Sequence, residues 1–143
     1  MKKRQNRQDV IRRIVRQDRV RTQREIVERL HEAGFVCTQA TVSRDVTEMG
    51  LRKLPDGLYV LSEDLHLQRM LNELVISVVR SEKLVLVKAS PGTAPGVAAA
   101  MDAAGLEEVL GSIAGDDTVL VICVSEAAAV ALLDNIAKLR GRS

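Results

Sequence analysis

Apolar residues recur at helical spacing in the first third of the chain. Residues 10–15 hold four apolar positions among arginines, which predicts a helix with a buried stripe and a basic outer face. A second helix is predicted after Thr22, because Thr22 and Glu25 form the capping-box pattern of a helix start. Gly34 follows the last apolar turn of that segment and is a typical helix stop. A short break then separates these two helices from a third.

The third predicted helix begins with the stretch TQATVSRD, residues 38–45, and runs to Gly50. At about 100° per residue, its apolar and polar side chains fall on opposite faces. The apolar face holds Val42, Val46 and Met49, and the opposite face holds Ala40, Arg44 and Thr47, flanked by Thr41 and Ser43. Short polar side chains allow close approach to another surface, and Arg, Gln, Ser and Thr can bond to base edges in the DNA major groove. The stretch favours a recognition helix, and a capped surface helix is the alternative.

A β-hairpin is predicted next. The segment LRKLPDGLYVL, residues 51–61, has two short apolar stretches around a Pro-Asp-Gly turn. Three helices followed by a hairpin form a winged helix-turn-helix, in which the third helix enters the major groove. In that layout Arg52 and Lys53 are placed to contact neighbouring phosphates.

The second half of the chain alternates strands and helices. The predicted order is β-β-α-β-β-α: strands at 73–80 and 84–90, a helix near 97–105, strands at 107–115 and 118–124, and a helix at 126–140 capped by Ser125. Such a sheet with helices on one face makes the fold class α+β. The Ala-rich helices, with scarcely any aromatic residues, suggest close packing or association with other copies. We therefore expect a winged-helix domain at 1–62, an amphipathic connector at 63–72, and an α/β oligomerisation and ligand-binding domain at 73–143.

The charge differs between these parts. Residues 1–62 carry 14 Lys and Arg against 8 Asp and Glu, a net charge of +6, and the remainder carries 7 against 11, a net charge of −4. Because phosphate contacts by Lys and Arg drive nucleic-acid affinity, only the first part is expected to bind a polyanion. A solvated basic face is the alternative explanation.

The composition of the chain indicates the cellular compartment in which the protein works. The two cysteines, Cys37 and Cys123, lie far apart and outside any zinc-binding pattern, which fits a reducing compartment. The basic start MKKRQNR lacks the apolar run of a signal peptide, and no apolar stretch approaches the roughly 20 residues of a membrane helix. We expect a cytoplasmic protein without a membrane partner. His31 and His66 lie too far apart to indicate a metal or catalytic site.

One chemical feature stands out in the second half. The sequence GDD, residues 115–117, lies between two predicted strands. Paired carboxylates can bind a metal, act in acid and base chemistry, or hold a guanidinium group in bidentate geometry. A plain hairpin turn is the alternative, because Gly and Asp are common turn residues. Neither a nucleophile–base pair nor a phosphate loop accompanies GDD, so binding is favoured over catalysis.

Two motifs together carry a family resemblance. TQATVSRD, residues 38–45, and GSIAGDDTVLVI, residues 111–122, resemble the bacterial arginine repressor family. The resemblance covers nearly the whole chain, with the hairpin and connector between the motifs. It implies a hexamer of two trimers of the C-terminal domain, with L-arginine bound between the trimers. The winged-helix domains would then be displayed for palindromic operators in double-stranded DNA.

The resemblance also implies roles for individual residues. Ser43 and Arg44 match the family's main DNA-contacting positions, and Gln39 and Thr41 are their neighbours on the same helix. The arginine-binding residues would be Asp102, Ser112, Asp116 and Asp117. Ser112 stands where the family commonly has Thr and keeps the hydroxyl. A larger departure is Pro95, where relatives often place Gln or His, because proline has no side-chain hydrogen-bond donor.

The resemblance thus implies an arginine-responsive transcriptional regulator that represses arginine biosynthesis genes. L-arginine would be the corepressor that stabilises the DNA-competent hexamer, with no metal cofactor and no enzyme activity. Activation of arginine breakdown stays open. One alternative is a winged-helix regulator that responds to a different small molecule, and another is an enzyme whose GDD turn binds a metal.

Overall fold

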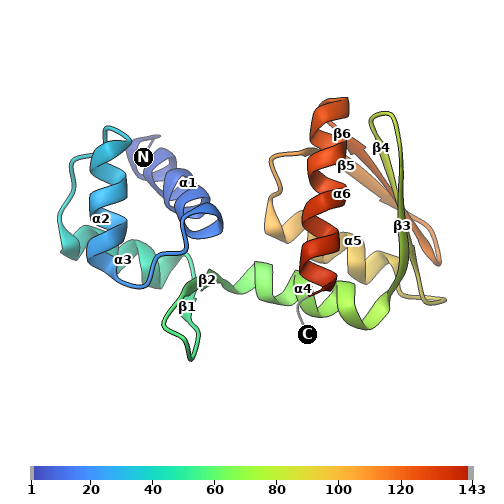
Figure 1. Cartoon of the computed structure of the whole chain (residues 1–143), viewed down its shortest axis with the longest axis horizontal. Coiled ribbons are helices and arrows are strands. Elements are labelled where there is room, and N and C mark those ends of the chain that lie inside the picture. The colour runs from blue at the N-terminus through green and yellow to red at the C-terminus, as the bar shows by residue number, and fades with distance from the viewer. Residues whose placement is uncertain (1, 142–143) are drawn as a thin grey trace. The chain divides into compact units, whose positions relative to one another are not determined.

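The chain divides into two compact units, residues 1–62 and 63–143. The computed structural model describes residues 2–141 (Figure 1). The outermost positions of the two predicted domains, Met1 and residues 142–143, therefore lie outside the described part. Each unit has its own buried apolar cluster.

The first unit contains three helices and a two-stranded hairpin. Its elements are α1 (Lys2–Gln17), α2 (Gln23–Glu32), α3 (Gln39–Glu48), β1 (Leu51–Lys53) and β2 (Tyr59–Leu61). Nine buried side chains from these elements and the α1–α2 loop form one core: Ile11, Ile14, Val15, Val20, Ile26, Leu30, Val42, Val46 and Leu61. The apolar stripes seen in the sequence are thus the buried faces of the three helices, and the unit is a winged helix-turn-helix.

Side-chain caps fix where α2 and α3 begin. The Glu25 backbone N–H donates to Thr22 Oγ1 at 3.1 Å, and the Thr41 N–H donates to Thr38 Oγ1 at 3.2 Å. Each bond satisfies one of the free N–H groups of a first helical turn. The Glu25 carboxylate accepts from the Arg21 N–H at 3.0 Å, one residue before the N-cap. In the predicted capping box, the Glu25 carboxylate therefore bonds to the backbone of the residue before Thr22 and not to that of Thr22 itself.

Two glycines set the path from α3 into the hairpin. Gly50 follows α3 with φ +67°, and Gly57 forms the hairpin turn with φ +91°. These left-handed conformations strain any side chain with a Cβ. Beyond the hairpin, the Ser62 hydroxyl donates to the Gly50 carbonyl at 2.5 Å and joins the end of the wing to the end of α3.

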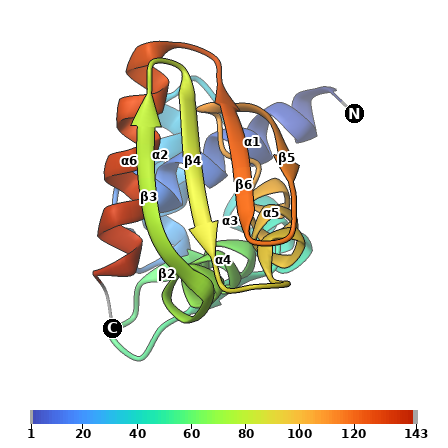
Figure 2. The same cartoon turned by 90° about the vertical axis from the view of Figure 1, so that its right-hand side faces the viewer.

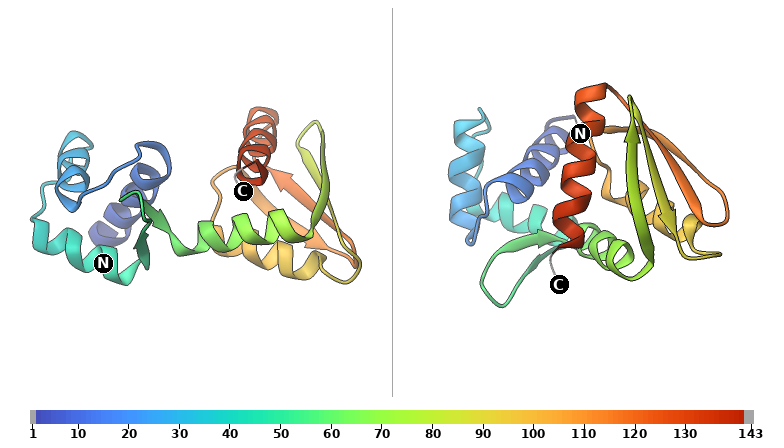
Figure 3. Two further views of the ribbon diagram at one scale, coloured as in Figure 1. Left: turned by 60° about the horizontal axis from the view of Figure 1, so that its bottom comes forward. Right: turned by 45° about the vertical axis from the view of Figure 1, so that its right-hand side comes forward.

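The second unit is a four-stranded antiparallel sheet with helices on one side. Its elements are α4 (Ser62–Leu74), β3 (Val75–Ser81), β4 (Leu84–Ala89), α5 (Ala94–Ala104), β5 (Val109–Ala114), β6 (Thr118–Cys123) and α6 (Glu126–Arg140). The strand order is β3-β4-β6-β5, so α5 carries the chain across β6 before β5 begins. Figure 2 looks onto the sheet face that no helix covers, and Figure 3 shows the helices on the other face.

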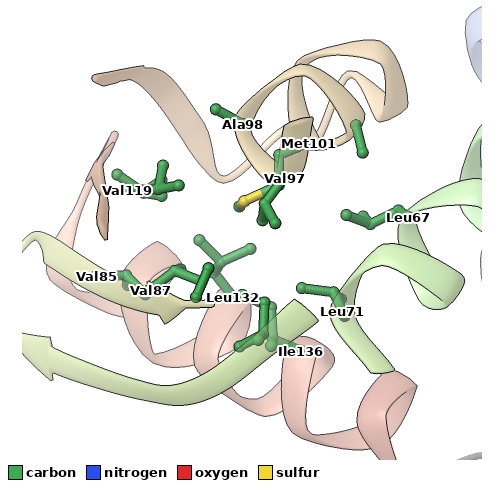
Figure 4. Close-up of a cluster of buried hydrophobic side chains, with 14 of the residues drawn as sticks. Leu67, Leu71, Val85, Val87, Val97, Ala98, Met101, Val119, Leu132 and Ile136 are labelled. Carbon is green, nitrogen blue, oxygen red and sulfur yellow. The ribbon is translucent and has the colours of Figure 1, made fainter. Parts of the chain in front are cut away.

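The core of this unit lies between the sheet and its helices (Figure 4). Leu71 of α4, Val87 of β4 and Leu132 of α6 are at most 1% exposed and meet there with Met101 of α5. Burying each such large side chain contributes about 1.5–3 kcal/mol. Side chains alternate between the two faces of the sheet along β6. Val119 and every second residue after it are buried against the helices, and the residues between them point to the other face.

The segment 63–72, expected from the sequence as a connector, forms most of α4. Its Leu67 and Leu71 belong to the core of the second unit. Strand β3 begins at Val75, two residues later than the pattern suggested, because α4 continues to Leu74. The Leu74 carbonyl accepts from the Ser90 N–H at 2.9 Å, which ties the end of α4 to the end of β4.

Candidate functional site

The exposed face of α3 presents the polar side chains singled out in the sequence. Gln39, Ser43 and Arg44 are exposed, and none of the three side chains makes a hydrogen bond or ion pair with the residues that the structure describes. Ser43 and Arg44 line a shallow open hollow together with Thr47 and Glu48. An unpaired guanidinium beside small hydroxyl side chains suits bidentate contact with a guanine edge or with phosphate.

Thr41 occupies a different place from its neighbours. Its side chain is half-buried, and its Oγ1 lies 3.0 Å from Thr38 Oγ1 at the start of α3. The two hydroxyls share one hydrogen bond within the cap. Thr41 therefore takes part in holding the first turn of α3, the end of a recognition helix that contacts bases.

The hairpin carries Arg52 and Lys53 on its first strand, and both are exposed. The Lys53 ammonium lies 5.2 Å from the centre of the Tyr59 ring on the second strand, in a cation–π arrangement. Arg21, from the loop before α2, donates from Nε to the Asp56 carbonyl at the hairpin tip at 3.3 Å. This contact steadies the wing, and no pattern in the sequence indicated it.

A carboxylate of the TQATVSRD stretch is buried. Asp45 is 1% exposed, and Arg7 of α1 donates to it from Nε at 2.6 Å and from Nη2 at 3.0 Å. Gln8 Nε2 adds a bond of 3.1 Å. Burial raises the pKa of Asp45, but these hydrogen bonds and the charges of Arg7 and Arg4 outweigh it, so the pKa lies below its usual value.

The burial of Asp45 was not predicted from the sequence, although the helical spacing of α3 indicates it. At about 100° per residue it lies beside Val42 and Met49, at the edge of the buried face of α3. A carboxylate at such a position needs a cation or several N–H donors to remain charged. The sequence did not say which of the basic residues of α1 would supply it.

In the second unit, the GDD turn is anchored by its backbone. The Asp117 carbonyl accepts from the Ala89 N–H at 2.7 Å, and the Asp116 carbonyl accepts from the Ala94 N–H at 3.1 Å. These bonds tie the turn to the end of β4 and the start of α5. The Asp117 side chain accepts from Thr118 Oγ1 at 2.9 Å, and Lys88 Nζ donates to that hydroxyl at 3.1 Å. Both carboxylates are exposed.

The other two candidate ligand-binding residues form a separate pair. Ser112 Oγ of β5 donates to Asp102 Oδ1 of α5 at 3.4 Å. Asp102 lies in the last turns of α5, whereas Asp116 contacts its first residue, Ala94. A helix rises about 1.5 Å per residue, so these positions lie about 12 Å apart along its axis. Within one chain, the four side chains therefore lie in two pairs, one near each end of α5.

Pro95 lies in the first turn of α5 and is exposed. The first N–H groups of a helix have no partner within the helix, so proline removes nothing that this turn needs. The preceding Thr93 does not cap α5, and its hydroxyl donates to the Ser90 carbonyl at 2.7 Å instead.

Neither cysteine has an environment that activates a thiolate. Cys37 is half-buried and Cys123 is buried, and burial raises the pKa of both thiols. Within residues 2–141, no three His, Cys, Asp or Glu side chains gather as a metal site would require. No helix in that range is long and apolar enough to cross a membrane.

Comparison with known proteins adds a second line of observation. Residues 1–66 match the family model of the arginine repressor DNA binding domain, and residues 71–138 match that of the arginine repressor C-terminal domain. The chain is 42% identical over 146 residues to the arginine repressor of Pelotomaculum thermopropionicum, covering 94% of this chain and 97% of that one. It is 45% identical over 127 residues to that of Carboxydothermus hydrogenoformans, covering 81% and 85%. For that of Thermus thermophilus the identity is 43% over 140 residues, covering 90% and 85%.

Proposed function

Because this chain belongs to the arginine repressor family, we propose that α3 and the wing bind palindromic operator DNA and that L-arginine binds at the acidic residues of the second unit. Membership makes the chain an arginine-responsive, DNA-binding repressor and not an enzyme. We propose further that L-arginine is the corepressor and that the controlled genes are those of arginine biosynthesis.

The observation that carries the DNA-binding proposal is the free guanidinium of Arg44. It stands on the exposed face of α3 beside Ser43, without a partner among the described residues. The unit around it has a net charge of +6 over residues 1–62, which supports attraction to phosphates. Arg52 and Lys53 extend the basic surface to the wing, where phosphate contacts would set the position of α3 in the groove.

The geometry of α5 supports a ligand site made by more than one chain. Asp116 and Asp117 lie by its first turn, and Asp102 and Ser112 lie by its last turns. A ligand that contacts both pairs is most simply held between two copies, with each copy supplying one pair. Ligand binding would then stabilise the assembled form by its differential affinity for that form.

Replacing Asp117 by Asn should shift the response to arginine to higher arginine concentrations while leaving DNA binding intact. The change keeps the shape of the side chain and its bond to Thr118 but removes the charge that pairs with a guanidinium. Losing such a charge-assisted bond costs about 1.5–3 kcal/mol, so arginine affinity should fall roughly 10- to 150-fold. The measurement is an arginine titration of binding to a DNA duplex that the unaltered protein selects from a randomised pool.

Asp134→Asn is the matched control, since it removes an exposed carboxylate of α6 that lies outside the proposed site. Lysine and citrulline should be titrated beside arginine, because citrulline has the same length without the charge. A chain that responds equally to citrulline would contradict the carboxylate site. DNA binding that ignores every amino acid would contradict the corepressor role.

We further propose that self-association into trimers and hexamers covers the bare face of the sheet. Four apolar residues lie in register across all four strands on that face: Val79, Leu86, Leu120 and Ile113. Val79 and Ile113 are 53% and 67% exposed, which is a large apolar area for a single soluble chain to leave in water.

Leu120→Glu should shift the protein from its largest assembly toward monomers, because the charge would be buried in the interface. Sedimentation velocity at several protein concentrations measures the shift. Ala127→Glu, which adds the same charge at an exposed position of α6, is the control. If Leu120→Glu assembles as the unaltered chain does, the bare face is not the interface.

A further inference from the structure

We infer that the ion pair between Arg7 of α1 and Asp45 of α3 positions the recognition helix, and that Arg7 acts through Asp45 and not by contacting a phosphate. The inference rests on the proposed role of α3 in DNA binding. It assigns to the first turns of α1 a positioning role in DNA binding, in place of the phosphate contacts that their positive charge indicates.

The first support is burial. Among the side chains that the structure describes, Asp45 is the only buried charged or polar one, and its side chain is 2% exposed against 18% for Arg7. Both oxygens of Asp45 accept from the planar guanidinium, in the fork geometry that only arginine provides. A buried carboxylate that loses such a partner is strongly unfavourable, so the pair ties the two helices together.

The second support is that the contact repeats one helical turn later. Glu48 of α3 pairs with Arg4 and accepts from Gln8 Nε2 at 3.0 Å. Gln8 therefore bonds to both carboxylates of α3, at 3.1 Å to Asp45. Arg4 and Glu48 are largely exposed and contribute little alone, whereas the buried pair fixes the geometry.

The third support is electrostatic. Asp45 follows Arg44 directly, so α3 brings a negative charge toward a polyanion together with its proposed DNA-contacting residue. Pairing with Arg7 cancels that charge within the protein. Two of the three guanidinium nitrogens of Arg7, Nε and Nη2, are engaged with Asp45, and the side chain is only 18% exposed, so little of the group is left to reach a phosphate.

The two possible roles of Arg7 predict different results for conservative variants. Arg7→Lys keeps the positive charge but loses the fork, and Arg7→Gln removes the charge as well. If Arg7 positions α3, both variants should bind the selected duplex about tenfold more weakly while their affinity for a scrambled duplex stays within twofold. A phosphate contact would instead survive in Arg7→Lys and, in Arg7→Gln, weaken binding to all sequences alike.

The salt dependence of binding gives an independent readout. The logarithm of the affinity falls linearly with the logarithm of the salt concentration, and each lost phosphate contact makes this line less steep by about 0.9. We expect the slope of Arg7→Gln to equal that of the unaltered protein, while Arg52→Gln, the exposed wing control, shows the smaller slope. A slope for Arg7→Gln that falls as it does for Arg52→Gln would overturn the inference.

A second substitution that restores DNA binding distinguishes a positioning role of Arg7 from a general loss of folding. In the double variant Arg7→Gln with Asp45→Asn, no charge is left unpaired and the two amides can still bond, so binding should recover to within about threefold of the unaltered protein. Circular dichroism at the binding temperature must show each variant folded. A double variant as weak as Arg7→Gln alone, with both folded, would overturn the inference. If the unaltered protein selects no duplex, the proposed function itself fails.

Discussion

Replacing Arg44 by Gln should cost the protein most of its affinity for its operator. A bidentate contact between arginine and a base is worth about 1–3 kcal/mol, which is about 5- to 150-fold for each half-site bound. Arg44 has no partner within the described part of the chain, so the variant loses DNA contacts and leaves no unpaired group behind. The folded structure should therefore be unchanged.

The measurement is equilibrium binding to the selected duplex at fixed salt and saturating arginine. Arg69→Gln is the matched control, because Arg69 is an exposed arginine of α4 in the second unit. Its loss changes the net charge equally and should alter the affinity less than twofold. The base preference is a second readout, since glutamine pairs with adenine where arginine pairs with guanine. Equal binding by both variants would mean that Arg44 does not contact DNA.

Leu132→Ala is expected to destabilise the second unit by about 2–5 kcal/mol. Leu132 of α6 is 1% exposed and lies in the middle of the core, so its removal leaves a cavity that the neighbouring side chains cannot fill (Figure 4). The loss is a large part of the stability of a domain of this size.

Denaturant unfolding followed by circular dichroism tests this expectation. Several protein concentrations are needed because self-association stabilises the folded state by mass action. Val130→Ala, a truncation at a 49% exposed position of the same helix, should change the stability by less than about 0.5 kcal/mol. A Leu132→Ala chain as stable as Val130→Ala would show that the core can close around the gap.

The hydrophobic pattern predicted the elements well because each helix or strand buries one face of its own sequence. Val42 and Val46 were expected to face inward in α3, and both lie in the core of the first unit. Thr38 and Ser125 were expected to cap helices, and each accepts the N–H three residues later. These features depend on residues close together in the chain, which is why local rules suffice.

Contacts between distant residues were not predictable in the same way. The partner of Asp45 lies 38 residues earlier in the chain, and several basic residues of α1 competed for that role. The strand order β3-β4-β6-β5 places β4 beside β6 and not beside β5, which periodicity does not reveal. The DNA-binding role of Arg44 and the ligand-binding role of the GDD turn were inferred from residue chemistry and then from the family resemblance, that of Asp102 came from the resemblance alone, and all three remain predictions.

The backbone anchoring of the GDD turn bears on how the specificity of such a sensor can change. The carbonyls of Asp116 and Asp117 fasten the turn to β4 and α5, and any amino acid offers the same carbonyl. The position of the turn therefore depends little on the two carboxylates. If the two carboxylates hold the effector, as we propose, substitutions there would change which small molecule is recognised while the backbone bonds still hold the turn, so a new effector specificity could arise by single mutations.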